Sequence, residues 1–229
     1  MKLFLFDVDL TLVNTGGAGL RALERACRKL LSVENAIEGI DPGGKTDPAI
    51  VREIFIRLGT TSDLEPRIET MLESYLAFLR EEVQTSEKYR VLPGISGILD
   101  EISARPGIML GLATGNIEPG ARAKLERGDL NRYFTFGGFG SDSENRTELV
   151  KKAGETAARK HGKTIRPEDI FVIGDTPLDI DAGRSAGYKT VGVATGRYST
   201  VRLHEAGATF VIADFEQGRE HFLRSTLAK

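Results

Sequence analysis

The stretch LFLFDVDLTL at residues 3–12 joins four consecutive apolar residues to two aspartates and a threonine. A continuous apolar run is typical of a parallel strand that is covered on both faces. Asp7 and Asp9 then lie at the carboxyl end of this strand, which is the edge where open α/β sheets bind ligands. Two carboxylates about 4 Å apart repel each other by roughly 4 kcal/mol at an effective dielectric constant near 20. The stretch therefore predicts a buried central strand that ends in a cation site.

The rest of the chain divides into a helical interval and a region where strands and helices alternate. Apolar stripes with helical spacing predict helices over residues 20–31, 50–58 and 64–83, and no strand pattern occurs between residues 14 and 90. Alternation after this interval predicts an α/β fold, a doubly wound parallel-sheet (Rossmann-like) core, with an inserted all-helical domain. We place the core at residues 1–13 and 91–229 and the insert at residues 14–90. Strands are expected at residues 108–113, 170–173, 190–194 and 209–213, with a weaker one at 133–136.

Composition excludes several classes of protein. The net charge of -2 over 229 residues gives no global basic surface, so we expect no nucleic-acid partner. No apolar run approaches the roughly 20 residues of a membrane-spanning helix, and the N-terminus lacks the apolar region of a signal peptide. The single cysteine, Cys27, lies on an apolar helical stripe and is interpreted as a core residue. A cytoplasmic protein without disulfides is the expectation.

Polar residues follow three of the predicted strands. Asp7 and Asp9 follow the first, Thr114-Gly115-Asn116 follows the strand at 108–113, and Gly174-Asp175 follows the strand at 170–173. Each group by itself has a simpler explanation as the cap of the next helix. Because the carboxyl ends of parallel strands meet at one edge of the sheet, the three groups together predict a shared site.

The motifs at these strand ends resemble those of the haloacid dehalogenase superfamily of phosphohydrolases. Residues 7–11 fit its DxDxT motif, Thr114 fits its strand-end Ser/Thr, and residues 174–179 fit its GDxxxD motif. The resemblance extends over essentially the whole chain. The helical interval is similar to the cap domain of phosphoglycolate phosphatase-like and β-phosphoglucomutase-like members.

The chain departs from the family pattern at three places. Leu10 stands where the family often has glycine, and Asn14 where it often has aspartate. The Lys-Pro pair of the family's third motif does not occur between Thr114 and Asp175. Spacing makes Arg146 the best substitute for that lysine, because it lies about thirty residues from both. Three lysines remain as alternatives: Lys124, Lys151 and Lys152.

The resemblance implies a reaction in which Asp7 attacks a phosphomonoester and forms an aspartyl-phosphate. Asp9 would be the general acid for the leaving alkoxide and then the general base for water. Mg²⁺ is the implied cofactor, held by the carboxylates of Asp7 and Asp175 and the backbone carbonyl of Asp9, because this ion prefers oxygen ligands. Asp179 would orient a metal-bound water or the cationic residue.

The resemblance also implies which residues contact the substrate. Thr114 and Arg146 would bind the phosphoryl oxygens, with Gly115 and Asn116 beside them. The insert would close over the site and contribute the loop that carries Lys45 and Asp47, although a simple turn that caps the next helix explains this loop equally well.

The expected function is that of a Mg²⁺-dependent phosphatase for a small phosphorylated metabolite. A phosphomutase of the β-phosphoglucomutase type would use the same residues and differ only in the acceptor of the phosphoryl group. A non-catalytic protein that binds metal and phosphate is the third hypothesis, because the Lys-Pro pair is missing. The sequence leaves the substrate open and allows a monomer or a homodimer.

Overall fold

The structure is a computed structural model that describes residues 1–227. Its core is a six-stranded parallel sheet in the order β5-β4-β1-β6-β7-β8. The first strand is therefore central, between β4 and β6, as its continuous apolar sequence predicts. The strands are β1 (Lys2–Phe6), β4 (Ile108–Thr114), β5 (Gly137–Phe139), β6 (Ile170–Gly174), β7 (Lys189–Val193) and β8 (Phe210–Ile212).

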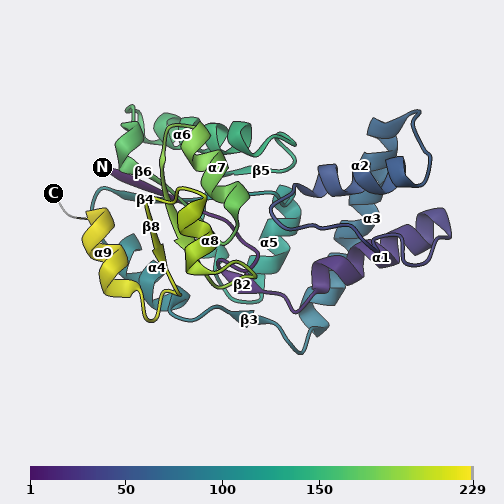
Figure 1. Cartoon of the computed structure of the whole chain (residues 1–229), viewed down its shortest axis with the longest axis horizontal. Coiled ribbons are helices and arrows are strands. Elements are labelled where there is room, and N and C mark those ends of the chain that lie inside the picture. The colour runs from purple at the N-terminus through teal and green to yellow at the C-terminus, as the bar shows by residue number, and fades with distance from the viewer. Residues whose placement is uncertain (228–229) are drawn as a thin grey trace.

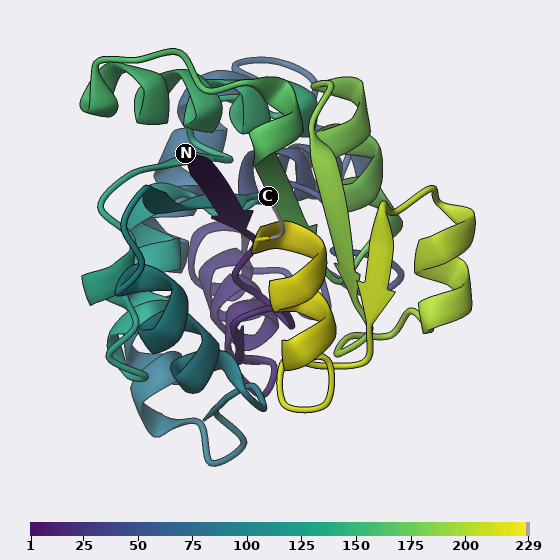
Figure 2. The ribbon, with the colours of Figure 1, turned by 90° about the vertical axis from the view of Figure 1, so that its left-hand side faces the viewer.

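Helices cover both faces of this sheet (Figure 2). Leu3 and Leu5 of β1 pack in a cluster with α6 (Arg146–His161) and α7 (Pro177–Ser185). Phe4 and Phe6 point to the opposite face, because successive side chains of a strand alternate. The helices on that face are α4 (Ile95–Ser103), α5 (Glu118–Glu126) and α9 (Arg219–Leu227), and α8 (Thr200–Glu205) packs beside β7 and β8. The predicted doubly wound α/β fold is confirmed.

Three helices lie between β2 (Val13–Asn14) and β3 (Arg90–Val91) and form the helical insert. They are α1 (Ala18–Leu31), α2 (Asp47–Arg57) and α3 (Leu64–Thr85). The insert has a hydrophobic cluster of its own, built from α1, α2 and α3 with Ile117 of the core at its border. It forms one end of the molecule, and the N-terminus and α9 lie at the other end (Figure 1). The predicted helical insertion is thus present, while its assignment as a separate domain with bounds at 14 and 90 stays a prediction.

The two connections between insert and core run side by side. β2 and β3 pair as a short antiparallel ladder. Beside it, the Ser86 hydroxyl donates a hydrogen bond of 2.7 Å to the carbonyl of Thr15. Gly16 and Gly17 follow β2 with φ of 63° and 82°, in the left-handed region that favours glycine. The insert therefore joins the core through one narrow double connection.

One predicted strand is wrong. Residues 131–133 form a short 3₁₀ helix, and β5 begins only at Gly137. A side chain at Gly138 would collide with the backbone of Leu149 in α6. The edge strand therefore forms where glycine allows this helix to pack closely against the sheet. The apolar run at 133–136 instead contributes Phe134 and Phe136 to the core. The other predicted strands begin and end within one residue of the prediction, whereas the short strands β2 and β3 were not predicted.

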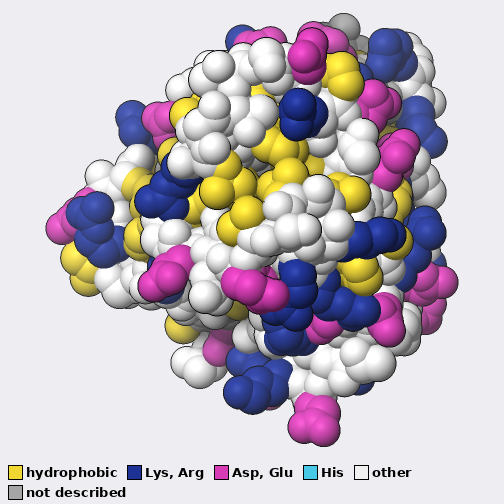
Figure 3. All heavy atoms as spheres, turned by 90° about the vertical axis from the view of Figure 1, so that its right-hand side faces the viewer, with side chains coloured by type: hydrophobic (Ala, Val, Ile, Leu, Met, Phe, Trp, Pro, Cys, Tyr) yellow, Lys and Arg dark blue, Asp and Glu magenta, His cyan; other side chains and the backbone are white. Residues whose placement is uncertain are grey.

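The outer end of the insert carries a mixed surface. Hydrophobic side chains gather in the middle of this face, with Lys and Arg side chains beside them (Figure 3). Leu30, Ile56 and Leu58 are among the exposed hydrophobic residues of the insert.

Within residues 1–227, no helix has both the length and the apolar character needed to cross a bilayer.

Candidate active site

The carboxyl ends of β4, β1 and β6 lie next to one another. Phe6 is in register with Leu112 of β4 and Ile173 of β6, and the Asp7 amide donates a hydrogen bond of 2.9 Å to the Ile173 carbonyl. The segments that follow the three strands, with Asp7, Thr114 and Asp175, therefore meet at one edge of the sheet. From β1 the sheet continues to β4 and β5 on one side and to β6, β7 and β8 on the other. Open α/β sheets form a ligand-binding crevice where the strand order changes direction in this way, at the carboxyl ends of the strands.

A tight turn at residues 10–12 follows Asp9. The Leu10 amide donates a hydrogen bond of 2.8 Å to the Val13 carbonyl across this turn, and the Val13 amide donates to the Val8 carbonyl at 3.1 Å. Leu10 has a φ of 56°, a left-handed conformation that costs a residue with a side chain about 1 kcal/mol or more. This conformation explains why glycine would be favourable at the position.

Three buried carboxylates form the first part of the site. Asp7, Asp175 and Asp179 each place a carboxylate oxygen within 4.8 Å of the others. Burial, followed by the charges of Asp179 and Asp9, raises the pKa of Asp7 to about 7, against the lowering effects of Arg146 and Thr114. Burial and the neighbouring charges of Asp179 and Asp7 raise the pKa of Asp175 to about 9. The cluster thus concentrates negative charge away from water, where a bound cation would relieve the repulsion.

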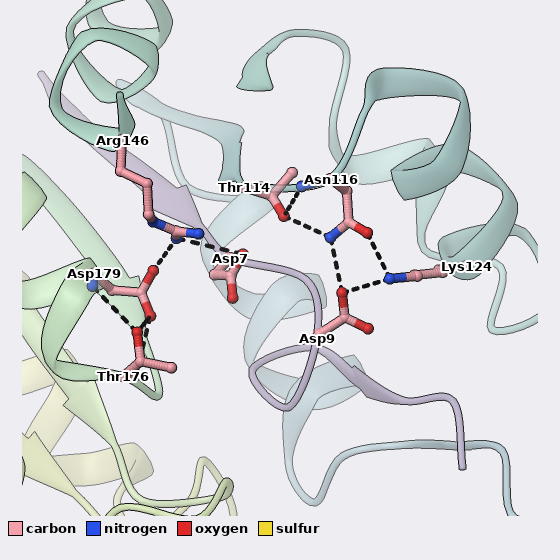
Figure 4. Close-up of polar contacts among 8 residues, drawn as sticks. All are labelled: Asp7, Asp9, Thr114, Asn116, Lys124, Arg146, Thr176 and Asp179. Carbon is pink, nitrogen blue, oxygen red and sulfur yellow. Dashed lines mark hydrogen bonds and ion pairs between the residues drawn. The ribbon is translucent and has the colours of Figure 1, made fainter. Parts of the chain in front are cut away.

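Arg146 supplies the cationic side chain beside these carboxylates. It is the first residue of α6, and Asn145 caps that helix by accepting a hydrogen bond from the Thr147 amide at 2.9 Å. The Arg146 guanidinium donates to Asp179 and lies 3.8 Å from Asp7, with its side chain 10% exposed. Figure 4 shows it between the two acids.

The other candidate cations lie elsewhere. Lys151 pairs with Glu148 at 3.2 Å and Lys152 pairs with Asp142 at 2.7 Å, both on the exposed side of α6. Among the four candidates from the sequence, Arg146 is therefore the one that contacts Asp7.

Asp179 is held in place by the start of α7. Thr176 is the N-cap of this helix and forms a capping box with Asp179, its third residue. The Thr176 amide and hydroxyl donate to one Asp179 oxygen at 3.0 and 2.7 Å, while Arg146 binds the other oxygen. Both oxygens of Asp179 are thus engaged by the protein, which leaves Asp7 and Asp175 better suited to contact a metal ion directly.

A second polar group surrounds Asp9. Its carboxylate turns toward Asn116 and Lys124, away from Asp7 (Figure 4). The Asn116 amide nitrogen donates to Asp9 and to the Thr114 hydroxyl, both at 2.8 Å, and Lys124 lies 2.6 Å from Asp9. Burial lowers the pKa of Lys124, but attraction to Asp9, Tyr75 and Asp47 outweighs it and raises the pKa overall. Lys124, a sequence candidate for binding phosphate, therefore pairs with Asp9 instead.

The helical insert contacts this edge of the core through Asp47, the first residue of α2. The Asp47 amide donates to the Gly115 carbonyl at 2.8 Å, and the Asp47 carboxylate accepts from the Ile117 amide at 2.9 Å. Burial raises the pKa of Asp47 to about 6, against the lowering effects of Lys124 and Ile117. Lys45 pairs with Glu53 of α2 at 2.5 Å. Thr46, and not Asp47, provides the cap of α2.

These residues line one pocket of about 480 Å³ between the core and the insert. The sequence candidates of this site line it except Asp179, which lies behind Arg146, and the exposed Lys151 and Lys152. Arg197 and Tyr75 are among the lining residues that were not singled out from the sequence. Arg197 follows β7, so its position after a strand end was a usable signal. Tyr75 belongs to the apolar stripe of α3, and nothing in the pattern distinguishes it from its core neighbours.

Comparisons with known proteins agree with this geometry. The family described as haloacid dehalogenase-like hydrolase matches residues 4–193. A phosphoglycolate phosphatase of Aquifex aeolicus is 27% identical, with 93% of this chain and 92% of the relative covered. A protein of Clostridium perfringens named "Putative pyrophosphatase PpaX" is 28% identical over 90% of this chain and 89% of its own length.

A similar fold occurs in the crystal structure of a hydrolase from Pseudomonas syringae. The TM-score is 0.74 at 21% identity, with 97% of this chain and 98% of that chain covered. At this identity the likeness concerns the fold alone.

Proposed function

Because this chain belongs to the family of haloacid dehalogenase-like hydrolases, we propose that it is a Mg²⁺-dependent phosphatase of a small phosphorylated metabolite. One observation carries the proposal. Asp7 lies among buried carboxylates beside Arg146, while Asp9, two residues further along the chain, lines the same pocket with its carboxylate turned away from Asp7. A nucleophile and a separate acid are what hydrolysis of a phosphomonoester needs.

The donor set fits magnesium, which prefers oxygen ligands. Asp7 and Asp175 would hold the ion with the Asp9 backbone carbonyl, and Asp179 would orient Arg146 from behind. The ion would supply positive charge that lets an anionic carboxylate approach an anionic phosphate. The raised pKa values of Asp7 and Asp175 support this assignment, since they reflect burial first and then repulsion among the carboxylates, and a bound cation would favour the ionised form against both.

The protein residues carry the reaction in two steps. Asp7 attacks phosphorus and the bond to the leaving oxygen breaks, while Asp9 gives that oxygen a proton. Asp9 then takes a proton from water as the water attacks the aspartyl-phosphate, which releases phosphate and restores Asp7. Arg146 and the Thr114 hydroxyl would neutralise and orient the phosphoryl oxygens, with the backbone of Gly115 and Asn116 close by.

The helical insert would act as the cap that excludes water from this chemistry. The loop with Lys45 and Asp47 already contacts the segment after β4, so it is placed to meet the leaving group. Separate hydrophobic clusters support the division into a core at 1–13 and 91–229 and a cap at 14–90. We further propose that the protein is cytoplasmic and is a monomer or a homodimer.

The test is phosphate release from p-nitrophenyl phosphate and from a panel of metabolite monoesters with Mg²⁺. Wild-type protein should hydrolyse at least one of these substrates. Asp7→Asn should lower the activity at least 10³-fold, because a covalent nucleophile contributes a factor of about this size. The matched control is Asp181→Asn, the same change at an exposed position of α7, which should keep full activity. Binding of phosphate without turnover would favour the non-catalytic alternative.

Product analysis separates the phosphatase from a phosphomutase. With a hexose 1-phosphate, a phosphatase gives free sugar and phosphate, whereas a mutase gives the hexose 6-phosphate. Formation of hexose 6-phosphate would show that a sugar hydroxyl, and not water, accepts the phosphoryl group in the step that Asp9 assists.

A further inference from the structure

Lys124 is a buried cation that the proposed reaction does not use. It belongs to α5, which begins directly after the segment Thr114 to Ile117, and its side chain is 5% exposed. Helical side chains lean toward the N-terminus of their helix, so Lys124 reaches back to the end of β4. Arg146 is the cation near Asp7, whereas Lys124 lies beside Asp9.

The surroundings of Lys124 come from both parts of the molecule. Gly19 of α1 lies next to its ammonium and to the Tyr75 hydroxyl of α3, since a Cβ added at Gly19 would lie 3.7 Å from each, an ordinary van der Waals distance. Asp47, at the start of α2, also contributes its charge. All three insert helices therefore enclose this ammonium, and water is largely excluded from it. A buried ammonium is costly unless it is paired, so its pairing with Asp9 is strongly maintained.

The contacts of Lys124 form a closed set around Asp9. Its ammonium donates to Asp9 Oδ2 at 2.6 Å and to Asn116 Oδ1 at 2.5 Å. Asn116 in turn donates to the same Asp9 oxygen and to Thr114, both at 2.8 Å. Asp9 is thus held by two donors that also hold each other, and Thr114 fixes the set to the end of β4. Figure 4 shows this set on the side of Asp9 that faces away from Asp7.

We propose that Lys124 is a positioning residue that acts through Asp9, resting on the proposed function in which Asp9 gives a proton to the leaving group. Lys124 and Asn116 hold the Asp9 carboxylate on the leaving-group side of the pocket and keep it apart from Asp7 and Asp175. Without the ammonium, one of the two donors to Asp9 Oδ2 is lost, and the carboxylate no longer has a fixed orientation. The proton transfer then loses the alignment on which its rate depends.

This role predicts a defect that depends on the leaving group. An alkoxide must receive a proton as it departs, whereas p-nitrophenolate is a stable anion and departs without one. The value of kcat/KM covers the steps up to release of the alcohol, so later hydrolysis of the aspartyl-phosphate does not affect it. Lys124→Met removes the charge at nearly constant length, and it should lower kcat/KM for an alkyl phosphate about 100-fold. For p-nitrophenyl phosphate the loss should stay below about threefold.

Controls separate positioning from a structural effect. Lys151→Met, on the exposed side of α6, should leave both substrates unaffected. The melting temperature identifies any variant that does not fold, and Lys124→Gln is a second variant that should show the same selective loss. In an Asp9→Asn background, Lys124→Met should cause no further decrease, because a residue that acts only through Asp9 has nothing left to position.

Three results would overturn the inference. If Lys124→Met lowers kcat/KM equally for both substrates, Lys124 binds phosphate and does not position Asp9. If the variant keeps full activity on the alkyl phosphate, Lys124 has no role in the reaction. If its loss adds to the loss caused by Asp9→Asn, Lys124 acts independently of Asp9. Failure of the proposed function itself is a different result, because wild-type protein would then hydrolyse neither substrate.

Discussion

Replacing Gly115 by alanine tests whether catalysis needs the closed arrangement of insert and core. A Cβ at Gly115 would collide with the backbone carbonyl of Lys45 and come within 2.9 Å of Arg146. The Lys45 contact involves backbone, so the loop before α2 must withdraw. Withdrawal breaks the two hydrogen bonds that join Asp47 to Gly115 and Ile117. With about 1 kcal/mol for the neutral bond and about 2 kcal/mol for the one to the carboxylate, the closed state loses about 3 kcal/mol.

A loss of about 3 kcal/mol corresponds to a decrease of about 100-fold in the ratio of closed to open molecules. We expect kcat/KM for the best substrate to fall by a similar factor. Trypsin cleavage after Lys45 should become faster, because the loop leaves the core. Gly97→Ala is the matched control: no atom lies within 4 Å of the added Cβ, and this exposed position in α4 should gain about 0.5–1 kcal/mol of stability. A Gly115→Ala protein with wild-type activity and unchanged cleavage at Lys45 would refute the closed arrangement as the active one.

Three further predictions concern charge and helix capping. Burial raises the pKa of Asp47 from 3.8 to about 6, so the folded state keeps a proton that the unfolded state has lost, and stability decreases as pH rises between these values. Asp47→Asn should therefore raise the free energy of unfolding by up to about 3 kcal/mol at pH 8 and by little near pH 4, which urea titrations at both pH values measure. Saturating Mg²⁺ added after chelator treatment should raise the melting temperature of wild type by about 5–10 °C and that of Asp175→Asn by much less; an equal rise in both would count against Asp175 as a ligand. Thr176→Val removes the capping box that holds Asp179, and should cost about 1–2 kcal/mol in urea denaturation and lower kcat/KM; unchanged activity would mean that Asp179 is oriented by Arg146 alone.

Local pattern was sufficient for the sheet and for the residues at its edge. The apolar run of β1 is buried on both faces, so its sequence alone indicates a central parallel strand. Once the strands are parallel, topology places Asp7, Thr114 and Asp175 at the same edge, whatever the details of packing. Chain spacing also identified Arg146 as a candidate cation, about thirty residues from both Thr114 and Asp175, and the structure places it at the first residue of α6, which packs beside β4.

Packing decided the features that pattern left open or predicted incorrectly. The edge strand β5 begins at Gly137 and Gly138, although the apolar residues at 133–136 have the stronger strand pattern. A side chain at Gly138 would collide with Leu149 of α6, and one at Gly137 would collide with Leu112 of β4 and with Phe139. Asp47 contacts Ile117 because the loop before α2 folds back onto the core. Neither outcome is encoded in the residues immediately around it.

The sequence by itself thus determined the strands of the sheet apart from β5, and the edge at which Asp7, Thr114 and Asp175 meet, because strand period and strand ends follow from local composition and the shared edge follows from parallel topology. Only the tertiary structure decided that Lys124 pairs with Asp9 and Arg146 with Asp179. The physical reason is that a buried charge takes the partner that the packing of distant helices brings within reach, and α1, α2 and α3 enclose Lys124 only after the insert has docked on the core.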